Sequence, residues 1–303
     1  MYDVIVVGGG PAGLTAALYA LRANKKVLVI EKGGFGGQIT YSPKVENIPG
    51  FLSLSGNEFA EKLTEQVLEQ GAEVEVAEVL SVKDNGKDKT VVTDSGDYVA
   101  TTVIIATGAR HRMLGLEREE QFVGEGISFC AVCDGAFYKD KTVAVIGGGN
   151  SALQEALLLT ENCKKVIMVQ NLDRFTGEER LLNQLKAKDN VAFITGTVVN
   201  RILGDKDLTG IEIKRESDGA LSTLEIDGMF IAIGLIPQNE PFGDIIELNS
   251  YGYAQSDELC TTKTPGVFVA GDCRSKTVRQ VTTACADGAV AALAACRFLD
   301  NLQ

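Results

Sequence analysis

The sequence predicts an α/β protein made of two Rossmann-like, three-layer nucleotide-binding domains, the second inserted into the first. Two stretches of the chain carry this prediction. Residues 4–32 and 143–171 both contain an apolar strand, a glycine-rich turn, an Ala/Leu-rich helix and a second apolar strand after a Lys-Lys pair. Continuous apolar runs are typical of buried parallel strands, and each such unit starts a doubly wound sheet. We expect the first domain at 1–115 and 243–303 and the inserted domain at 116–242.

The remaining elements follow from local patterns. Between the two repeats, an amphipathic helix near 57–70 ends at Gly71, and alternating apolar residues predict strands over 73–82 and 89–99. The run TTVIIATGA then predicts a buried strand that enters a glycine turn. After the second repeat, NVAFITGTVV, TGIEIKRE and DGMFIAIG predict strands, and LIPQNEPFG predicts a crossing back to the first domain. PGVFVAGDC and a long helix near 278–300 complete that domain.

Composition excludes several function classes. The chain has 303 residues, 45% of them hydrophobic, and a net charge of −12, which argues against general binding to nucleic acid or to anionic membranes. No charged leader precedes the first strand, so we expect no signal peptide. The most apolar helix, DGAVAALAACRFL, is expected to be too short and too rich in alanine to span a bilayer. An odd count of seven cysteines favours a reducing cytoplasm.

The first glycine-rich turn matches a dinucleotide-binding pattern. Gly8-x-Gly10-x-x-Gly13 lies between an apolar strand and a helix, as the pattern requires. Gly8 permits a tight turn, Gly10 lets backbone N–H groups approach a pyrophosphate, and Gly13 lets the helix pack closely on the strand. Glu31 ends the next strand and can accept hydrogen bonds from ribose hydroxyls. A plain tight turn is the alternative, but strand, helix and Glu31 together favour a dinucleotide.

A second motif is the pair Cys130-Ala-Val-Cys133, followed by Asp134. Such a pair can bind zinc, but zinc sites usually need a second ligand pair, and the other cysteines are scattered. We therefore expect a redox-active pair and no metal site, with zinc binding or unreactive thiols as the alternatives. Asp134 is a candidate proton carrier or, alternatively, a capping carboxylate. The single histidine, His111, is expected at the surface without an acid–base role.

Several stretches jointly resemble one known family. VVGGGPAG, GGQIT, VENIPGF, ATGARHRMLG, FCAVCDGAFY, VIGGGNSALQEA, FIAIGLIPQNE and PGVFVAGDCRSKTVRQVTTACADGAVAA are similar, over nearly the whole chain, to the low-molecular-weight flavin-dependent thioredoxin reductases. The resemblance implies FAD on the first repeat, thioredoxin as the substrate, a homodimer, and the CxxC in an inserted redox domain that resembles an NADPH domain. The positions that match the family's FAD contacts are Gly8, Gly10, Pro11, Ala12, Gly13, Glu31, Lys32, Gly37, Gln38, Asn47, Ala106, Thr107, Gly108, Gly271, Asp272, Arg279, Gln280 and Val281.

The resemblance also implies roles at the redox pair. Cys133 would be the thiol that faces the flavin, and Cys130 would attack the disulfide of thioredoxin. Asp134 would act as the general acid. By the same similarity, Asp272 would hold the ribityl chain, and Gln280 would lie along the flavin ring.

The second glycine-rich turn lacks the family's cations for NADPH. NADPH-using members end the second strand with a His-Arg-Arg-x-x-x-Arg pattern that binds the 2′-phosphate. The corresponding positions here are Gln170, Asn171, Leu172 and Thr176. At roughly 1.5–3 kcal/mol for each charged hydrogen bond, the loss of three would weaken NADPH by about 1,000-fold. Arg174 is a nearby cation that compensates at most in part. NADH would need a carboxylate at the strand end, which is also absent.

The sequence is more similar to the ferredoxin-dependent flavin thioredoxin reductases, which lack the NADPH pattern. We therefore expect electrons to pass from reduced ferredoxin through FAD and the CxxC disulfide to thioredoxin. Because ferredoxins are commonly acidic, a basic patch is needed, and Arg110–Arg112 with Arg22, Lys25 and Lys26 are candidates, ordinary solvated surface being the alternative. Two other functions stay open: an NAD(P)H-dependent enzyme with an unusual 2′-phosphate pocket, and a non-catalytic flavoprotein redox sensor.

Overall fold

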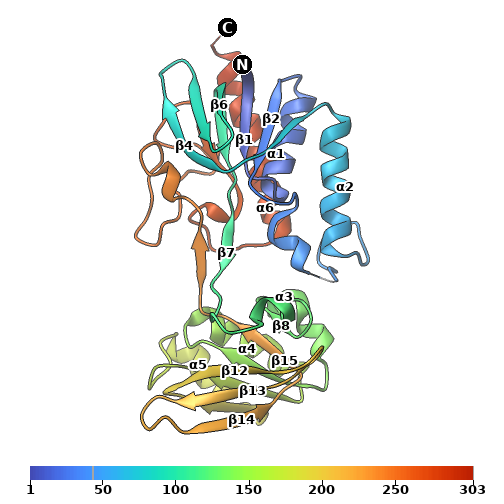
Figure 1. Ribbon diagram of the computed structural model, residues 1–303, viewed down its shortest axis with the longest axis vertical. Helices are drawn as coiled ribbons and strands as arrows, with labels where there is room; N and C mark the ends of the chain where they lie inside the picture. The colour runs from blue at the N-terminus through green and yellow to red at the C-terminus, as the bar shows by residue number, and fades with distance from the viewer. Residues whose placement is uncertain (43, 303) are drawn as a thin grey trace. The chain divides into compact units, whose positions relative to one another are not determined.

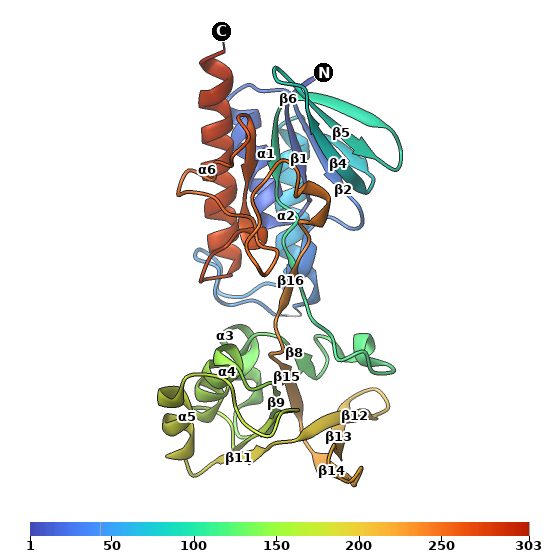
Figure 2. The same cartoon turned by 90° about the vertical axis from the view of Figure 1, so that its left-hand side faces the viewer.

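The computed structural model describes residues 1–42 and 44–302 and divides the chain into two compact units (Figure 1). The first unit contains Met1–Lys44, Ile48–Arg110 and Ile236–Gln303, and the second contains Val45–Asn47 and His111–Leu235. Two strands carry the chain between the units and pair as a two-stranded sheet, β7 (Ala109–His111) and β16 (Leu235–Pro237) (Figure 2).

The first unit is built on a seven-stranded sheet with the order β3-β2-β1-β6-β5-β4, in which β17 also pairs with β6. Its parallel strands are β1 (Tyr2–Val7), β2 (Val27–Glu31), β3 (Glu73–Val76), β6 (Asp97–Ile105) and β17 (Val267–Val269). The strands β4 (Val79–Asp84) and β5 (Lys89–Thr93) pair antiparallel. Side chains of β1 alternate between two cores, since Val4 and Val6 face one cluster and Ile5 and Val7 the other.

Helices cover only one face of this sheet. The helices α1 (Pro11–Arg22), α2 (Gly56–Glu69) and α6 (Val281–Asp300) contribute to the cluster around Val4 and Val6. The opposite cluster is closed by β4, β5 and a segment that includes Phe242 and Ile246. The three-layer prediction therefore holds, but the third layer consists of strands and loop in place of the helices of a doubly wound sheet. A short 3₁₀ helix, η4 (Glu240–Phe242), opens that segment.

The second unit repeats this design. Its parallel sheet has the order β11-β10-β9-β15-β8. One face packs against α4 (Asn150–Thr160), α5 (Glu179–Lys186) and the short α3 (Ala131–Asp134). The other face packs against an antiparallel sheet of β12 (Thr197–Gly204), β13 (Leu208–Arg215) and β14 (Leu221–Glu225). The parallel strands are β8 (Ile127–Ser128), β9 (Thr142–Ile146), β10 (Lys165–Val169), β11 (Val191–Ile194) and β15 (Gly228–Ile231).

The predicted repeats are confirmed, since β1-α1-β2 and β9-α4-β10 have the same parallel arrangement. Two strand predictions are wrong in detail. The segment 73–82 forms two strands, because β3 pairs with β2 and the chain then leaves to pair β4 with β5. The segment 89–99 ends at Thr93 and turns at Gly96, whose φ is +148°, so that TTVIIATGA is the end of β6. β14 was not predicted, because its side chains are largely exposed and polar.

The helix α6 ends at the predicted position, begins three residues later than expected, and buries its small side chains. It has 20 residues with a mean hydropathy of 1.3, so the expectation that it is too short to cross a membrane is wrong on length alone. However, Ala284, Ala291 and Ala295 belong to the core shared with α1. A Cβ at Gly288 would lie 2.1 Å from Ala12 O, which shows how closely the two helices approach. This packing is typical of a core helix. The length and the apolar composition of a single helix are only weak support for a membrane span.

The close helix contact gives a stability prediction. We expect Gly288→Ala to destabilise the protein by about 1–3 kcal/mol or more, because the added methyl group meets the Ala12 backbone. Urea unfolding at equilibrium measures the change. Gly34→Ala is the matched control, because a Cβ there meets no atom within 4 Å. Equal stability of the two variants would show that α6 does not pack on α1 in this way.

Candidate active site

The first glycine-rich turn is fixed by two close backbone approaches and one side-chain hydrogen bond. Gly8 has φ +111°, and a Cβ there would lie 2.4 Å from Ala106 O. A Cβ at Gly13 would lie 1.9 Å from Gly8 O, so only glycine lets α1 begin directly above the end of β1. Glu31 braces the turn, because its Oε2 accepts from Gly9 N at 2.7 Å. The roles inferred for Gly8 and Gly13 from their spacing match these contacts.

The middle of this turn leaves room for a ligand. A Cβ at Gly10 would have no protein atom nearer than 3.9 Å, although Gly10 is the N-cap of α1. Gly37, with φ +65°, lies across from it, since its own Cβ would be 3.3 Å from Gly10 Cα. Pro11 is the first helical residue and Ala12 the second. The free N–H groups of the first helical turn therefore lie at an open face, which suits a pyrophosphate.

The structure brings two further predicted segments to this turn. Ala106 N donates to Val7 O at 2.8 Å, which places Ala106–Gly108 beside the end of β1. On the other side, a Cβ at Gly271 would lie 2.7 Å from Ala12 Cβ. Thr107 and Gly108 follow Ala106 directly, and Gly271 opens the 3₁₀ helix η5 (Gly271–Cys273). Both segments therefore lie beside the first glycine turn, and their contacts with a dinucleotide stay a prediction.

The carboxyl group of Asp272 is the clearest candidate for a ligand contact. Its Oδ1 is buried and has no hydrogen-bond partner among the described residues. Burial raises the pKa of Asp272, while Lys276 and Arg279 act in the opposite direction. Asp287 fixes the loop around it, because it accepts from Gly271 N at 3.1 Å and pairs with Lys276 at 2.9 Å. An orphaned buried carboxylate oxygen fits a ligand with hydroxyl donors, such as a ribityl chain.

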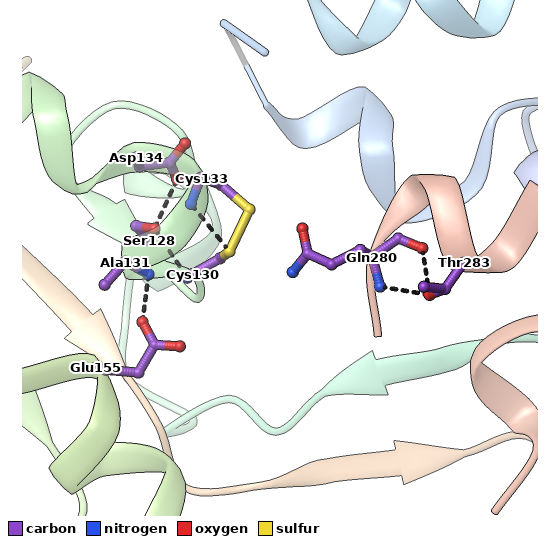
Figure 3. Close-up of a disulfide and its surroundings, with 8 residues drawn as sticks. All are labelled: Ser128, Cys130, Ala131, Cys133, Asp134, Glu155, Gln280 and Thr283. Carbon is purple, nitrogen blue, oxygen red and sulfur yellow. Dashed lines mark hydrogen bonds between the residues drawn. A yellow bond between two sulfur atoms is a disulfide. The ribbon is translucent and has the colours of Figure 1, made fainter. Parts of the chain in front are cut away.

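The predicted residues at the start of α6 lie in the same segment. Arg279 Nε donates to Asp272 O at 3.4 Å, and its guanidinium lies 4.2 Å from the Tyr253 ring centroid. Gln280 is the N-cap of α6, where Gln280 N donates to Thr283 Oγ1 at 3.1 Å (Figure 3). Val281 then begins the helix. This helix start gives a second set of backbone N–H groups next to Asp272.

Three predicted contacts are less directly placed. Gln38 lies in η1 (Gly37–Tyr41) directly after Gly37. Lys32 is exposed and points to Gln238 Oε1 at 3.5 Å and Glu78 Oε1 at 3.9 Å. Asn47 belongs to the short segment Val45–Asn47 that groups with the second unit. These residues therefore remain predictions.

The cysteines of the CxxC form a disulfide in the second unit (Figure 3). Cys130 is the N-cap of α3, and its Sγ accepts from Cys133 N at 3.2 Å. Both cysteines are partly exposed, unlike the buried Cys163. A disulfide excludes zinc coordination by these sulfurs in this state, and it supports the redox prediction. Among residues 1–42 and 44–302, no group of three His, Cys, Asp or Glu side chains gathers to hold a metal.

Asp134 lies against the same turn. Its Oδ2 accepts from Ser128 Oγ at 2.6 Å, and Ser128 Oγ in turn accepts from Cys130 N at 3.1 Å. Its other oxygen, Oδ1, is buried and has no partner among the described residues. Burial raises the pKa of Asp134, and the Ser128 hydrogen bond partly opposes this. A carboxyl group with a raised pKa and a free oxygen beside a disulfide is suited to carry a proton.

Sequence reasoning missed Glu155, which reaches the redox turn from α4. Its Oε2 accepts a hydrogen bond from Ala131 N (Figure 3). The pKa of Glu155 is raised to about 7, chiefly because the group is buried; the Ala131 hydrogen bond acts in the opposite direction, and the charge of Asp134 adds to the rise. The signal in the sequence was its place in VIGGGNSALQEA, where it is the sixth residue of α4.

His111 does not lie freely at the surface, contrary to the sequence expectation. It is half-buried, and its ring stacks on Phe129 with the centroids 4.4 Å apart. Burial lowers the pKa of His111 to about 4, so the ring is neutral near pH 7. It supports the residue before Cys130 and is not placed to exchange a proton with the sulfurs.

The second glycine-rich turn has the same backbone but a different side chain beside it. Val7 lies opposite Ile30, and Ile146 lies opposite Val169, so Gln170 occupies the position of Glu31. Gln170 is buried, and its Nε2 donates to Arg174 O at 3.3 Å. A Cβ at Gly148 would lie 2.4 Å from this Nε2, so the neutral amide fills the space beside the turn.

A side chain added at Gly10 should weaken cofactor binding without disturbing the folded structure. We expect Gly10→Ala to keep the folded structure, since a Cβ there is free of protein atoms, yet to weaken FAD binding at least about tenfold, or about 1.4 kcal/mol. Fluorescence titration of the flavin-free protein measures the affinity. Gly13→Ala, whose Cβ would clash with Gly8 O, should instead lower stability. Undiminished FAD affinity in Gly10→Ala would show that the pyrophosphate lies elsewhere.

Comparison with known proteins agrees with this geometry. The pyridine nucleotide-disulphide oxidoreductase family matches residues 2–288. Thioredoxin reductase of Listeria monocytogenes is 41% identical over 304 residues, which span 100% of this chain and 95% of the relative. The crystal structure of thioredoxin reductase from Streptococcus pyogenes matches with a TM-score of 0.95 at 39% identity, over 99% of each chain. The chain therefore belongs to the pyridine nucleotide-disulphide oxidoreductase family, as a flavin-dependent disulfide oxidoreductase that binds FAD.

Proposed function

We propose that the protein is a thioredoxin reductase that takes electrons from reduced ferredoxin. The single observation that carries the first part is the Cys130–Cys133 disulfide with Asp134 beside it, in a fold whose first glycine turn fits FAD. Related proteins of Listeria monocytogenes and Bacillus subtilis, at 41% and 40% identity, are named thioredoxin reductases, which supports thioredoxin as the substrate. Bound FAD would supply the reducing equivalents that open the disulfide.

The chain's own residues then perform thiol–disulfide exchange. The Cys130 thiolate attacks one sulfur of the thioredoxin disulfide, so that a mixed disulfide forms and a thioredoxin thiolate leaves. The Cys133 thiolate next attacks Cys130 Sγ, which restores the Cys130–Cys133 disulfide and releases the second thioredoxin thiolate. Asp134 protonates a leaving thiolate, and Ser128 holds its carboxyl group in place. Two electrons leave the pair, and thioredoxin ends as a dithiol.

The electron donor is inferred from the second glycine turn. Its strand ends in the buried neutral Gln170, and Asn171, Leu172 and Thr176 replace the cations that hold a 2′-phosphate. The position that Glu31 occupies in the first turn therefore offers no carboxylate for a ribose diol either. Both observations argue against tight binding of NADPH or NADH and favour a protein donor.

The proposed basic docking patch is smaller than the sequence indicated. Lys25 pairs with Asp300 at 2.5 Å and Lys26 with Glu73 at 3.2 Å, so neither cation is free to meet an acidic partner. Arg110 and Arg112 are exposed, and neither has an ion pair within the described part of the chain. If ferredoxin docks through charge, these two arginines and the exposed Arg22 are the remaining candidates.

An NADPH-dependent reductase is the second candidate, because NADPH is the usual donor of thioredoxin reductases. Arg174, exposed in the loop after Gln170, is the observation that favours it. A non-catalytic flavoprotein sensor is less consistent with the partly exposed disulfide and its paired carboxyl group. From the family resemblance we also propose a homodimer, and the five remaining free cysteines suit a reducing cytoplasm.

The donor proposal predicts a clear difference in anaerobic reduction. Reduced ferredoxin should bleach the bound flavin rapidly, whereas NADPH and NADH at micromolar concentrations should not. Stopped-flow absorbance with each donor in turn measures the rates. The variant Gln170→His, Asn171→Arg, Leu172→Arg and Thr176→Arg should gain NADPH affinity, by up to about 1,000-fold if the phosphate contacts alone were lost. Rapid reduction of the unchanged protein by micromolar NADPH would exclude the ferredoxin proposal.

The cysteine roles predict opposite trapping behaviour. Cys133→Ser should accumulate a mixed disulfide with thioredoxin, because Cys130 attacks but nothing then releases it. Cys130→Ser should form none, and both variants should lose thioredoxin reduction. Non-reducing electrophoresis and intact mass measure the adduct, with Cys163→Ser as a buried-cysteine control. Trapping by Cys130→Ser and not by Cys133→Ser would reverse the assignment.

A further inference from the structure

Glu155 is the one ionisable group at the redox turn that the exchange steps above do not use. It projects from α4, on which the turn is seated, since Ala131 packs into the same core as Ala152 and Ala156. Its carboxylate accepts from Ala131 N, the first helical N–H group after Cys130 (Figure 3). A charged side chain thus touches the backbone between the two cysteines.

This contact changes what stabilises a thiolate at the turn. Backbone N–H groups at the start of a helix, and nearby cations, normally lower the pKa of a cysteine there. Here the Ala131 N–H is already bonded to a carboxylate, and only Cys133 N donates to Cys130 Sγ. Glu155 bonds to Ala131 N and Asp134 to Ser128 Oγ, and both of these carboxyl groups are negative when ionised.

We propose that Glu155 is a positioning residue for the redox pair: it holds the Ala131 N–H away from Cys130 and places a negative charge beside the sulfurs, which stabilises the disulfide relative to the dithiol. The proposal rests on the proposed function only in that the pair must be redox-active, and it names a residue that sets the balance between its two states.

The surroundings of Glu155 offer little to cancel this charge. Asp134 raises the pKa of Glu155 further, and Tyr138 stays protonated because burial raises its pKa to about 12. Burial likewise raises the pKa of Cys163 to about 11. The charged residues of the other elements that pack on α4 are exposed, and these are Lys165 on β10 and Glu179, Arg180 and Lys186 on α5.

The electron and proton balance follows directly. Reduction breaks the Cys130–Cys133 bond with two electrons and one proton, and leaves one thiol and one thiolate. When Glu155 is ionised, the new thiolate is a like charge nearby, so Glu155 binds part of a further proton from water as the disulfide opens. Below about pH 7 Glu155 is already protonated, and this extra uptake disappears.

The test compares Glu155→Gln with the unchanged protein in dithiothreitol redox buffers. Glutamine keeps an oxygen acceptor for Ala131 N but carries no charge. The FAD-loaded full chain is equilibrated between pH 5.5 and 8.5 and quenched with an alkylating agent, and the alkylated Cys130–Cys133 peptide is counted by mass spectrometry. Glu161→Gln is the matched control, because Glu161 ends the same helix at an exposed ion pair with Lys188.

At pH 8 we expect Glu155→Gln to raise the ratio of dithiol to disulfide about tenfold, or about 30 mV in midpoint potential. At pH 5.5 the two proteins should agree, and Glu161→Gln should follow the unchanged protein throughout. Cys130 should also be alkylated at a pH about one unit lower in Glu155→Gln. An unchanged ratio at pH 8, or an equal change at every pH, would overturn the proposal. Dithiothreitol supplies the electrons, and no thioredoxin, ferredoxin or nicotinamide nucleotide enters the assay, so its outcome is independent of whether the proposed function holds.

Discussion

In each unit a helix begins directly above the end of a parallel strand. The side chain that directly follows the neighbouring strand determines which ligand groups can bind at the start of that helix. The strand registers place Glu31 and Gln170 at equivalent positions. Glu31 is ionisable, braces Gly9 N and leaves Gly10 open, whereas Gln170 turns its amide onto Gly148 and the backbone of Arg174. The two turns thus share a backbone arrangement, but the first presents a carboxylate at this position and the second a neutral amide.

The redox turn depends on the second of these units in a different way. The α4 helix, which the glycine turn starts, supplies the apolar seat of α3 and the Glu155 carboxylate. Asp134 and Ser128 close the other side of the turn. Gly147 and Ala152 have a structural role at the start of α4, because a Cβ at Gly147 would lie 2.5 Å from Ala232 O and Ala152 is fully buried. A change that displaces α4 would therefore also displace the turn that carries the disulfide.

Patterns in the sequence predicted the repeated strand–helix–strand units and the pair of redox cysteines. The two strand–helix–strand units, the α2 helix and the Cys130–Cys133 pair were evident, because periodicity and spacing are local properties. The break between β3 and β4 was not, since Ala77 and Val79 are both buried and continue the alternation across it. Glu155 and the orphaned oxygen of Asp272 were also beyond reach, because their significance comes from contacts between distant segments. The pairing of Lys25 with Asp300 likewise joins opposite ends of the chain.

The central claim is that the first glycine turn binds a dinucleotide and the second does not. Isothermal titration of the FAD-loaded protein with NADPH and with NADH, in the absence of any other donor, tests this most directly. We expect one FAD per chain and no saturable binding of either nicotinamide nucleotide with a Kd below about 1 mM. That Kd corresponds to a binding free energy of about −4 kcal/mol. Saturable binding of NADPH or NADH at micromolar concentration would contradict it.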